Sequence, residues 1–149
     1  MNRPTAEMRD FAQGLVAREA RGNKSSGTKA PLVFGAVVDK LRRPLIILAG
    51  AAVFRSLLSR ALALAIDEVR WLRAVHVKAD GSLECPAEIA RLGQKEIAHA
   101  EAVLITQLLG LLLTFIGEAL TLRLLLDVWP GAPVNDFYSS RKDSKREET

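Results

Sequence analysis

AVLITQLLGLLLTFIGEALTLRLLLDVW, residues 102–129, decides the fold class of this chain. Leu, Ile and Ala dominate the stretch and no proline interrupts it before Pro130, so we predict a helix here. Leucine occurs on every side of this helix. A helix that is apolar all round is either buried by protein on all sides or surrounded by lipid.

The uncharged part of this stretch, 102–117, is sixteen residues long, whereas a membrane-spanning helix needs about 20 residues. Extending the helix to Leu126 reaches that length but takes in Glu118 and Arg123. A charge in the middle of a span costs about 2.5–3.5 kcal/mol. We therefore expect the stretch to be buried in the core of an oligomer, and we keep a membrane span over 102–126 as the alternative.

Composition narrows the fold class and the location. Of the 149 residues, 49% are hydrophobic but only 5% are aromatic, which is typical of a helical bundle rather than a sheet. The length suits one domain. Cys85 is the single cysteine, so no internal disulfide can form, and we expect a reducing, cytoplasmic location.

The sequence predicts two long helices joined by a turn. The first continues from about 44 to 78 and the second from about 86 to 129, and neither contains a strong internal break. Asp80-Gly81 is a helix stop and turn signal, which places the tip at 79–85. The predicted fold is therefore all-α: a long antiparallel helical hairpin with short N-terminal helices, completed into a bundle by oligomerisation.

The chain divides into three segments by composition. Residues 1–30 are predicted to form an amphipathic N-terminal arm and a flexible linker rich in Gly, Ser and Lys. Residues 31–131 form the hairpin domain. Residues 132–149 form a charged tail that is too poor in apolar residues to fold, so we expect it to be disordered.

Two short helices are expected before the hairpin. The N-terminal helix, 5–21, has an apolar face made of Met8, Phe11, Ala12 and Leu15, and Gly22 can end it. A second helix begins at Pro31 and is expected to end or kink at Pro44.

Small or weakly polar residues recur every three or four positions along both long helices. These packing stripes are Ala49, Ala52, Ser56, Ser59 and Ala63 on the first helix, and Gly110, Thr114 and Gly117 on the second. Because the two stripes lie at matching distances from the tip, we expect them to face each other and to let the helices pack closely. The half of the hairpin nearer the termini is too apolar for one partner helix to cover, so it needs 31–43, a second copy or lipid.

Several charges lie within or beside these apolar helices. Such charges must be paired or reach water. The candidates for buried ion pairs are Arg42, Arg43, Arg55, Glu118, Arg123 and Asp127. We hypothesise that Glu118 pairs with Arg42, Arg43 or Arg55, from the same chain or from a second copy, and that the pair sets the register of packing.

No set of residues indicates catalysis or metal binding. Glu96-x-x-His99 has the spacing of a di-iron helix-bundle motif, but such sites need a second pair and two further carboxylates, and Asp67-Glu68 supplies only part of these. Cys85 has no His or basic neighbour to lower its pKa. There is no phosphate-binding loop, nucleophile elbow or zinc spacing. We therefore predict no metal, no cofactor and no enzymatic activity.

FRSLLSRALALA (54–65) and LLGLLLTFIGEALTLRLLLDVWP (108–130) resemble segments shared by a group of small bacterial proteins of no established function. The resemblance covers 31–131. It implies a bacterial source and a common helical fold, and it transfers no functional residue to this chain.

Three classes of function remain. The first is a non-enzymatic oligomerisation or interaction module whose tails could recruit another protein. The second is a membrane-associated hairpin, an effector or regulator of a membrane complex; Lys and Arg gather before 44 and after 140, which would place both termini in the cytoplasm and the hairpin in the inner membrane. The third is nucleic-acid binding by the basic ends, which intermixed acids and few aromatics make unlikely. We favour the first, as a homo-oligomer.

Overall fold

The computed structural model describes residues 6–25 and 34–132. These residues form an all-α fold, as predicted. Its elements, in chain order, are α1 (Ala6–Ser25), α2 (Ala36–Ala49), α3 (Ala51–Ile66), the 3-10 turn η1 (Arg70–Ala74), the strands β1 (His76–Val77) and β2 (Leu83–Glu84), the 3-10 turn η2 (Ala87–Arg91), α4 (Gln94–Phe115) and α5 (Glu118–Val128). The two strands pair antiparallel, with His76 opposite Glu84.

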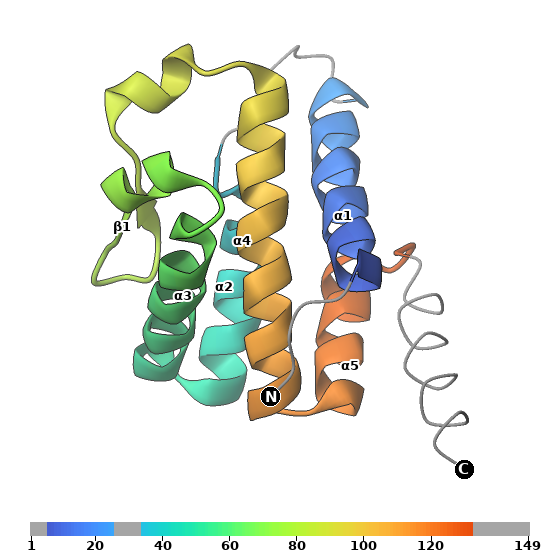
Figure 1. The fold of residues 1–149 in the computed structure, drawn as a ribbon. Coiled ribbons are helices and arrows are strands. Elements are labelled where there is room, and N and C mark those ends of the chain that lie inside the picture. Colours follow the sequence, from blue (N-terminus) through green and yellow to red (C-terminus); the bar gives the residue numbers. More distant parts are fainter. Residues whose placement is uncertain (1–5, 26–33, 133–149) are drawn as a thin grey trace.

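Helix α4 is the centre of the fold. It lies between α1 and α3, with α2 behind it and α5 near its C-terminal end (Figure 1). Thirteen of its 22 residues are buried, which accounts for its apolar character on every side. The hydroxyls of Thr106 and Thr114 donate to the carbonyls of Ala102 and Gly110, so they need no partner from a neighbouring helix.

Both arms of the expected hairpin are broken at a glycine. Gly50 separates α2 from α3 with φ 95° and ψ 157°, and Gly117 separates α4 from α5 with φ 87° and ψ 169°. Only glycine adopts this backbone region without strain. The prediction of continuous helices over 44–78 and 86–129 is therefore wrong: two isolated glycines act as chain reversals, and in addition α3 already ends at Ile66 and α4 begins only at Gln94.

A shorter antiparallel pair remains at the core of the expected hairpin, formed by α3 and α4, which lie side by side (Figure 1). The connection between them is longer than the predicted tip at 79–85, since it includes η1, the strand pair and η2. The turn itself lies where Asp80-Gly81 predicted it. Asp80 stabilises the turn by accepting hydrogen bonds from the backbone N–H and the hydroxyl of Ser82.

Pro44 lies inside α2 rather than at its end. It has no N–H to donate to the carbonyl of Lys40, a change that costs about 3 kcal/mol in a helix interior. Leu41 and Leu45 on either side of this position are fully buried in the core. The helix continues because burial of these side chains outweighs the lost hydrogen bond.

Helix α1 belongs to the core and is not a separate arm. The predicted apolar face is buried together with Val16, against α4. The helix also continues past Gly22 to Ser25. The prediction of a separate N-terminal arm is therefore corrected for residues 6–25, which pack in the core. Residues 26–30 of the predicted linker and residues 133–149 of the predicted tail lie outside the described residues.

The positive φ of the chain-breaking glycines predicts that alanine at such a position lowers the free energy of unfolding. We expect Gly117→Ala to lower the free energy of unfolding by about 1–3 kcal/mol, because alanine is strained at this φ and ψ. An added Cβ would meet no atom within 4 Å, so the loss would come from the backbone alone. Urea denaturation measures it.

Gly14→Ala is the matched control. Gly14 lies within α1 at an ordinary helical φ and also has open space around an added Cβ. Alanine should therefore raise stability there by about 0.5–1 kcal/mol. Equal effects at the two positions would contradict the proposed role of Gly117.

Candidate interaction surface

A buried carboxylate positions α2 on the central helix. Glu101 of α4 is completely buried, and its two oxygens accept hydrogen bonds from the backbone N–H groups of Gly35 (2.7 Å) and Val37 (3.0 Å). These donors belong to the first turn of α2, which has no side-chain cap of its own. Glu101 thus caps α2 from a helix more than sixty residues away, at the end of α2 where a negative charge is favourable.

Burial changes the titration of this carboxylate. Desolvation raises the pKa of Glu101 to about 7, although the hydrogen bonds from Gly35 and Val37 act in the opposite direction. Burial also raises the pKa of the half-buried Cys85 thiol, and the nearby charge of Glu101 adds to that rise. The thiol is therefore protonated at neutral pH and is a poor nucleophile.

A second buried acid links three helices. Glu19 of α1 accepts a hydrogen bond from the indole N–H of Trp129 at 2.9 Å and pairs with the ammonium group of Lys40 at 2.6 Å. Trp129 directly follows α5, and Lys40 lies on α2. Arg18 also donates to the carbonyl of Gly131 at 2.6 Å. Together these contacts hold the end of α5 and the middle of α2 against α1.

Helices α2 and α5, which these contacts hold against α1, form the two walls of an open groove at one end of the molecule. Its volume is about 620 Å³, far more than the roughly 30 Å³ of one water molecule. We call it the end groove; α2 contributes Arg43, Pro44, Ile47 and Leu48, and α5 contributes Leu120, Arg123, Leu124 and Asp127. On each helix these residues recur at the i, i+3, i+4 spacing of a single face.

The groove and its surroundings expose large apolar side chains. Ile47 is 80% exposed and Leu120 is 45% exposed. Phe115 at the end of α4 and Leu126 on α5 are also exposed. Of the six large apolar side chains exposed in the described part of the chain, Ile47, Leu48 and Leu120 line the end groove. Half of these exposed side chains therefore share one surface feature.

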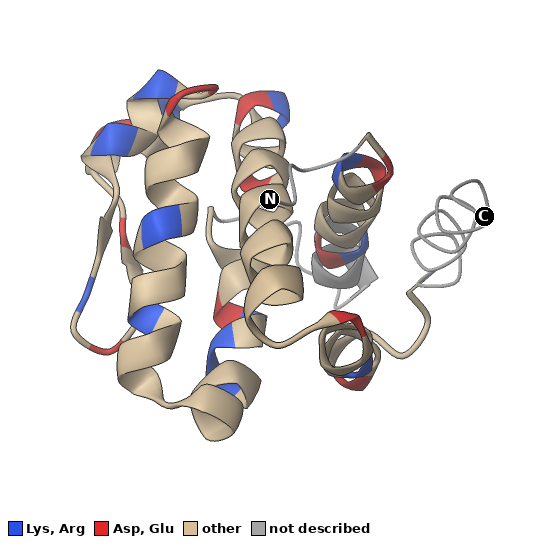
Figure 2. Cartoon of the chain, turned by 60° about the horizontal axis from the view of Figure 1, so that its bottom comes forward, with Lys and Arg blue, Asp and Glu red and all other residues tan. Residues whose placement is uncertain are grey.

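Three of the predicted ion-pair residues meet at this groove, but they are not buried. Arg43, Arg123 and Asp127 are exposed and line the groove, so they are not buried within a single chain. Charges of both signs are visible on α2 and α5 in Figure 2. Among the residues that the structure describes, none of these three forms an ion pair.

The other three ion-pair candidates are half-buried. Arg42 pairs with Asp39 at 3.3 Å and with Asp80 at 3.7 Å. The Nε of Arg55 is buried without a hydrogen-bond partner. Glu118 is the first residue of α5, where its charge faces the positive end of the helix. Its pairing with Arg42, Arg43 or Arg55 stays a prediction.

The predicted packing stripes do not face each other. Gly110 is buried, but Ala52, Ser56, Ser59 and Ala63 are exposed on α3 and Thr114 is exposed on α4; Ala49 and Gly117 are half-buried beside the chain breaks. The physical reason is that Phe54, Leu58 and Leu62 form the buried side of α3. Their larger apolar area outweighs the closer approach that small residues allow.

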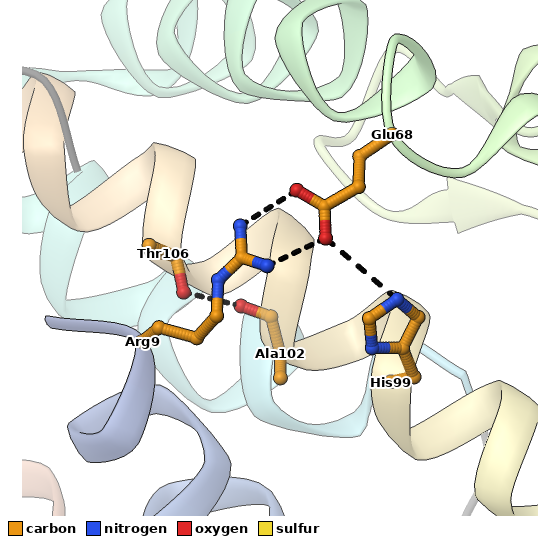
Figure 3. Close-up of polar contacts among 5 residues, drawn as sticks. All are labelled: Arg9, Glu68, His99, Ala102 and Thr106. Atoms are coloured by element: carbon orange, nitrogen blue, oxygen red, sulfur yellow. Dashed lines mark hydrogen bonds and ion pairs between the residues drawn. The ribbon is translucent and has the colours of Figure 1, made fainter. Parts of the chain in front are cut away.

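His99, from the potential metal motif, lies in an ion-pair cluster. Arg9 of α1 and His99 of α4 both point toward Glu68, which follows α3 (Figure 3). Arg9 makes two hydrogen bonds to the Glu68 carboxylate, at 2.6 and 2.7 Å, and these bonds lower the pKa of Glu68. The Nε2 of His99 lies 3.7 Å from the same carboxylate. The arrangement is an ion-pair clamp between α1 and α3.

Asp67 and Glu96 are exposed. Within 6–25 and 34–132, no three potential metal-ligating side chains come together. The Glu96-x-x-His99 spacing therefore leads to no convergent set of ligands in the part of the chain that the structure describes.

Sequence reasoning missed both buried acids. Glu101 lies four residues after Ile97 and four before Ile105, so it continues the buried side of α4. Glu19 likewise lies four residues after Leu15 on the buried face of α1. This spacing was the signal that could have identified them, because an acid on an apolar face needs a fixed partner.

Comparisons of the chain with protein-family models, with curated proteins and with solved structures find no match. The resemblance of 31–131 to small bacterial helical proteins therefore stays a prediction.

The buried carboxylate predicts a pH dependence of stability. Between pH 4.5 and about 7, the folded Glu101 carboxyl holds a proton that the unfolded chain lacks. The free energy of unfolding should therefore fall as the pH rises through this window, by on the order of 3 kcal/mol, and stay level with respect to this group above it. Urea denaturation at pH 5 and pH 8 measures the difference.

Glu101→Gln removes the ionisable group and should abolish most of this pH dependence. Glu96→Gln, an exposed position on the same helix, is the control and should keep the wild-type difference between pH 5 and pH 8. An unchanged pH dependence in Glu101→Gln would show that other groups cause it.

Proposed function

We propose that this protein is a non-enzymatic helical module that works by self-association through the end groove. The observation that carries the proposal is the exposure of Ile47, Leu48 and Leu120 along the end groove. An exposed apolar groove of this kind is typical of an interaction site. Because Ile47, Leu48 and Leu120 are themselves exposed, the groove resembles an open docking face more than an enclosed small-molecule pocket.

The distribution of polar groups supports a non-enzymatic role. The buried acids, Glu19 and Glu101, are engaged in holding α2 and α5. Cys85 is kept protonated by burial. The polar residues of the end groove are two arginines and one aspartate, a set that suits ion pairs at the edge of an apolar interface.

Membrane association is the second candidate. Among the described helices, α4 alone is long and apolar enough to cross a membrane by length and composition. The candidate span is Gln94–Phe115 rather than 102–126, because Gly117 ends the helix. An apolar 18-residue stretch of this helix is 72% buried inside the protein, which favours a core helix over a span. A cytoplasmic location accordingly remains our proposal.

The test compares two exposed apolar residues in the absence of detergent. Ile47→Asp places a charge at the most exposed apolar side chain of the end groove, while Leu64→Asp does the same on α3 outside it. We expect the wild type and Leu64→Asp to form one discrete oligomer, and Ile47→Asp to dissociate at least tenfold more readily, since burial of this side chain is worth about 1.5–3 kcal/mol. Light-scattering chromatography over a concentration series measures the mass.

A wild-type mass of 16.3 kDa at every concentration would overturn the proposal, and so would an Ile47→Asp variant that associates like the wild type. Pelleting of the wild type with membranes, together with resistance to carbonate extraction, would overturn it in favour of the membrane alternative. Circular dichroism of both variants verifies that the fold is intact.

A further inference from the structure

The exposed side of α5 combines apolar and charged residues in an ordered way. Leu120, Arg123, Leu126 and Asp127 are exposed on this helix. Arg123 and Asp127 lie four residues apart, which is about 6 Å along the axis. Neither forms an ion pair within the part of the chain that the structure describes. Both charges are therefore available to a partner that supplies the opposite sign at the same spacing.

A second copy of α5 supplies this pattern only if it runs antiparallel. A two-fold axis that crosses the helix pair between Arg123 and Asp127 places each arginine opposite the partner's aspartate, so one contact is made twice. Parallel pairing would place like charges opposite each other and would be repulsive. An anionic lipid surface would attract Arg43 and Arg123 but repel Asp127, so the two signs favour a copy of this chain over a membrane.

We infer that the end groove of one copy receives helix α5 of a second copy in a closed, two-fold symmetric dimer, with reciprocal Arg123–Asp127 ion pairs between antiparallel α5 helices. This inference rests on the proposed function and specifies its partner, stoichiometry and register. In this arrangement Leu120 flanks the ion pairs, and Ile47 and Leu48 form the other wall of each groove. A symmetric contact of this kind closes on itself, so no larger assembly forms.

Charge reversal provides the test, because both positions are exposed and tolerate substitution. Arg123→Glu alone and Asp127→Arg alone each replace two attractions by two repulsions, so each should raise the dimer Kd roughly tenfold or more at low salt. An equimolar mixture of the two variants should dimerise with near wild-type affinity, since every contact in the mixed dimer then joins opposite charges. Arg60→Glu, an exposed arginine of α3 outside the groove, is the matched control and should leave the Kd unchanged.

The mixing experiment separates effects between chains from effects within one helix. Arg123 and Asp127 are also neighbours on α5, but a helix weakened by one substitution is not repaired by adding a different chain. Recovery of dimer in the mixture, seen by sedimentation velocity with one variant fluorescently labelled, supports the inference. A weaker single-variant effect at 1 M salt is also expected, because salt screens exposed charges.

Each negative result has a distinct meaning. If Ile47→Asp dissociates the oligomer but the mixture shows no recovery, the proposed function stands and the antiparallel α5 register is wrong. If the wild-type oligomer is larger than a dimer, the closed two-fold arrangement is overturned. If the wild type is monomeric throughout, the proposed function itself fails.

Discussion

The hydrogen bonds from the first turn of α2 to the Glu101 carboxylate are the constraint on which the rest of the structure depends. Gly35 and Val37 donate to a carboxylate that is completely buried in the middle of the molecule. A buried charge of this kind is costly unless it is fully satisfied. The position of α2 is therefore set by the few geometries in which its free N–H groups reach Glu101.

The remaining outer helices are held by a similar combination of apolar burial and a few directed polar contacts. Glu19 links α1 to Lys40 and Trp129, and Arg9 links α1 to Glu68. Apolar packing is non-directional, so it explains why each helix turns its apolar side toward α4 but not where along α4 each helix lies. The polar contacts select one arrangement, and that arrangement leaves Ile47 and Leu120 uncovered at one end.

The way α2 and α5 fold back explains where apolar side chains remain on the surface. In a long straight hairpin, the apolar surplus would extend along both arms. The reversals at Gly50 and Gly117 instead fold α2 and α5 back beside the core helices. Much of the surplus is thereby buried, and Ile47, Leu48 and Leu120 remain exposed along the end groove.

The all-α class and the apolar face of α1 followed from the sequence alone, because they depend on local residue type and on the 3.6-residue period. The breaks at Gly50 and Gly117, the exposure of Ser56 and Ser59 and the partners of Glu101 could not be predicted in this way. A glycine permits a reversal without requiring one, and a small residue packs well only where no larger apolar side chain on the same helix packs better. Tertiary structure alone decided these features, because each depends on which segments distant in sequence come into contact.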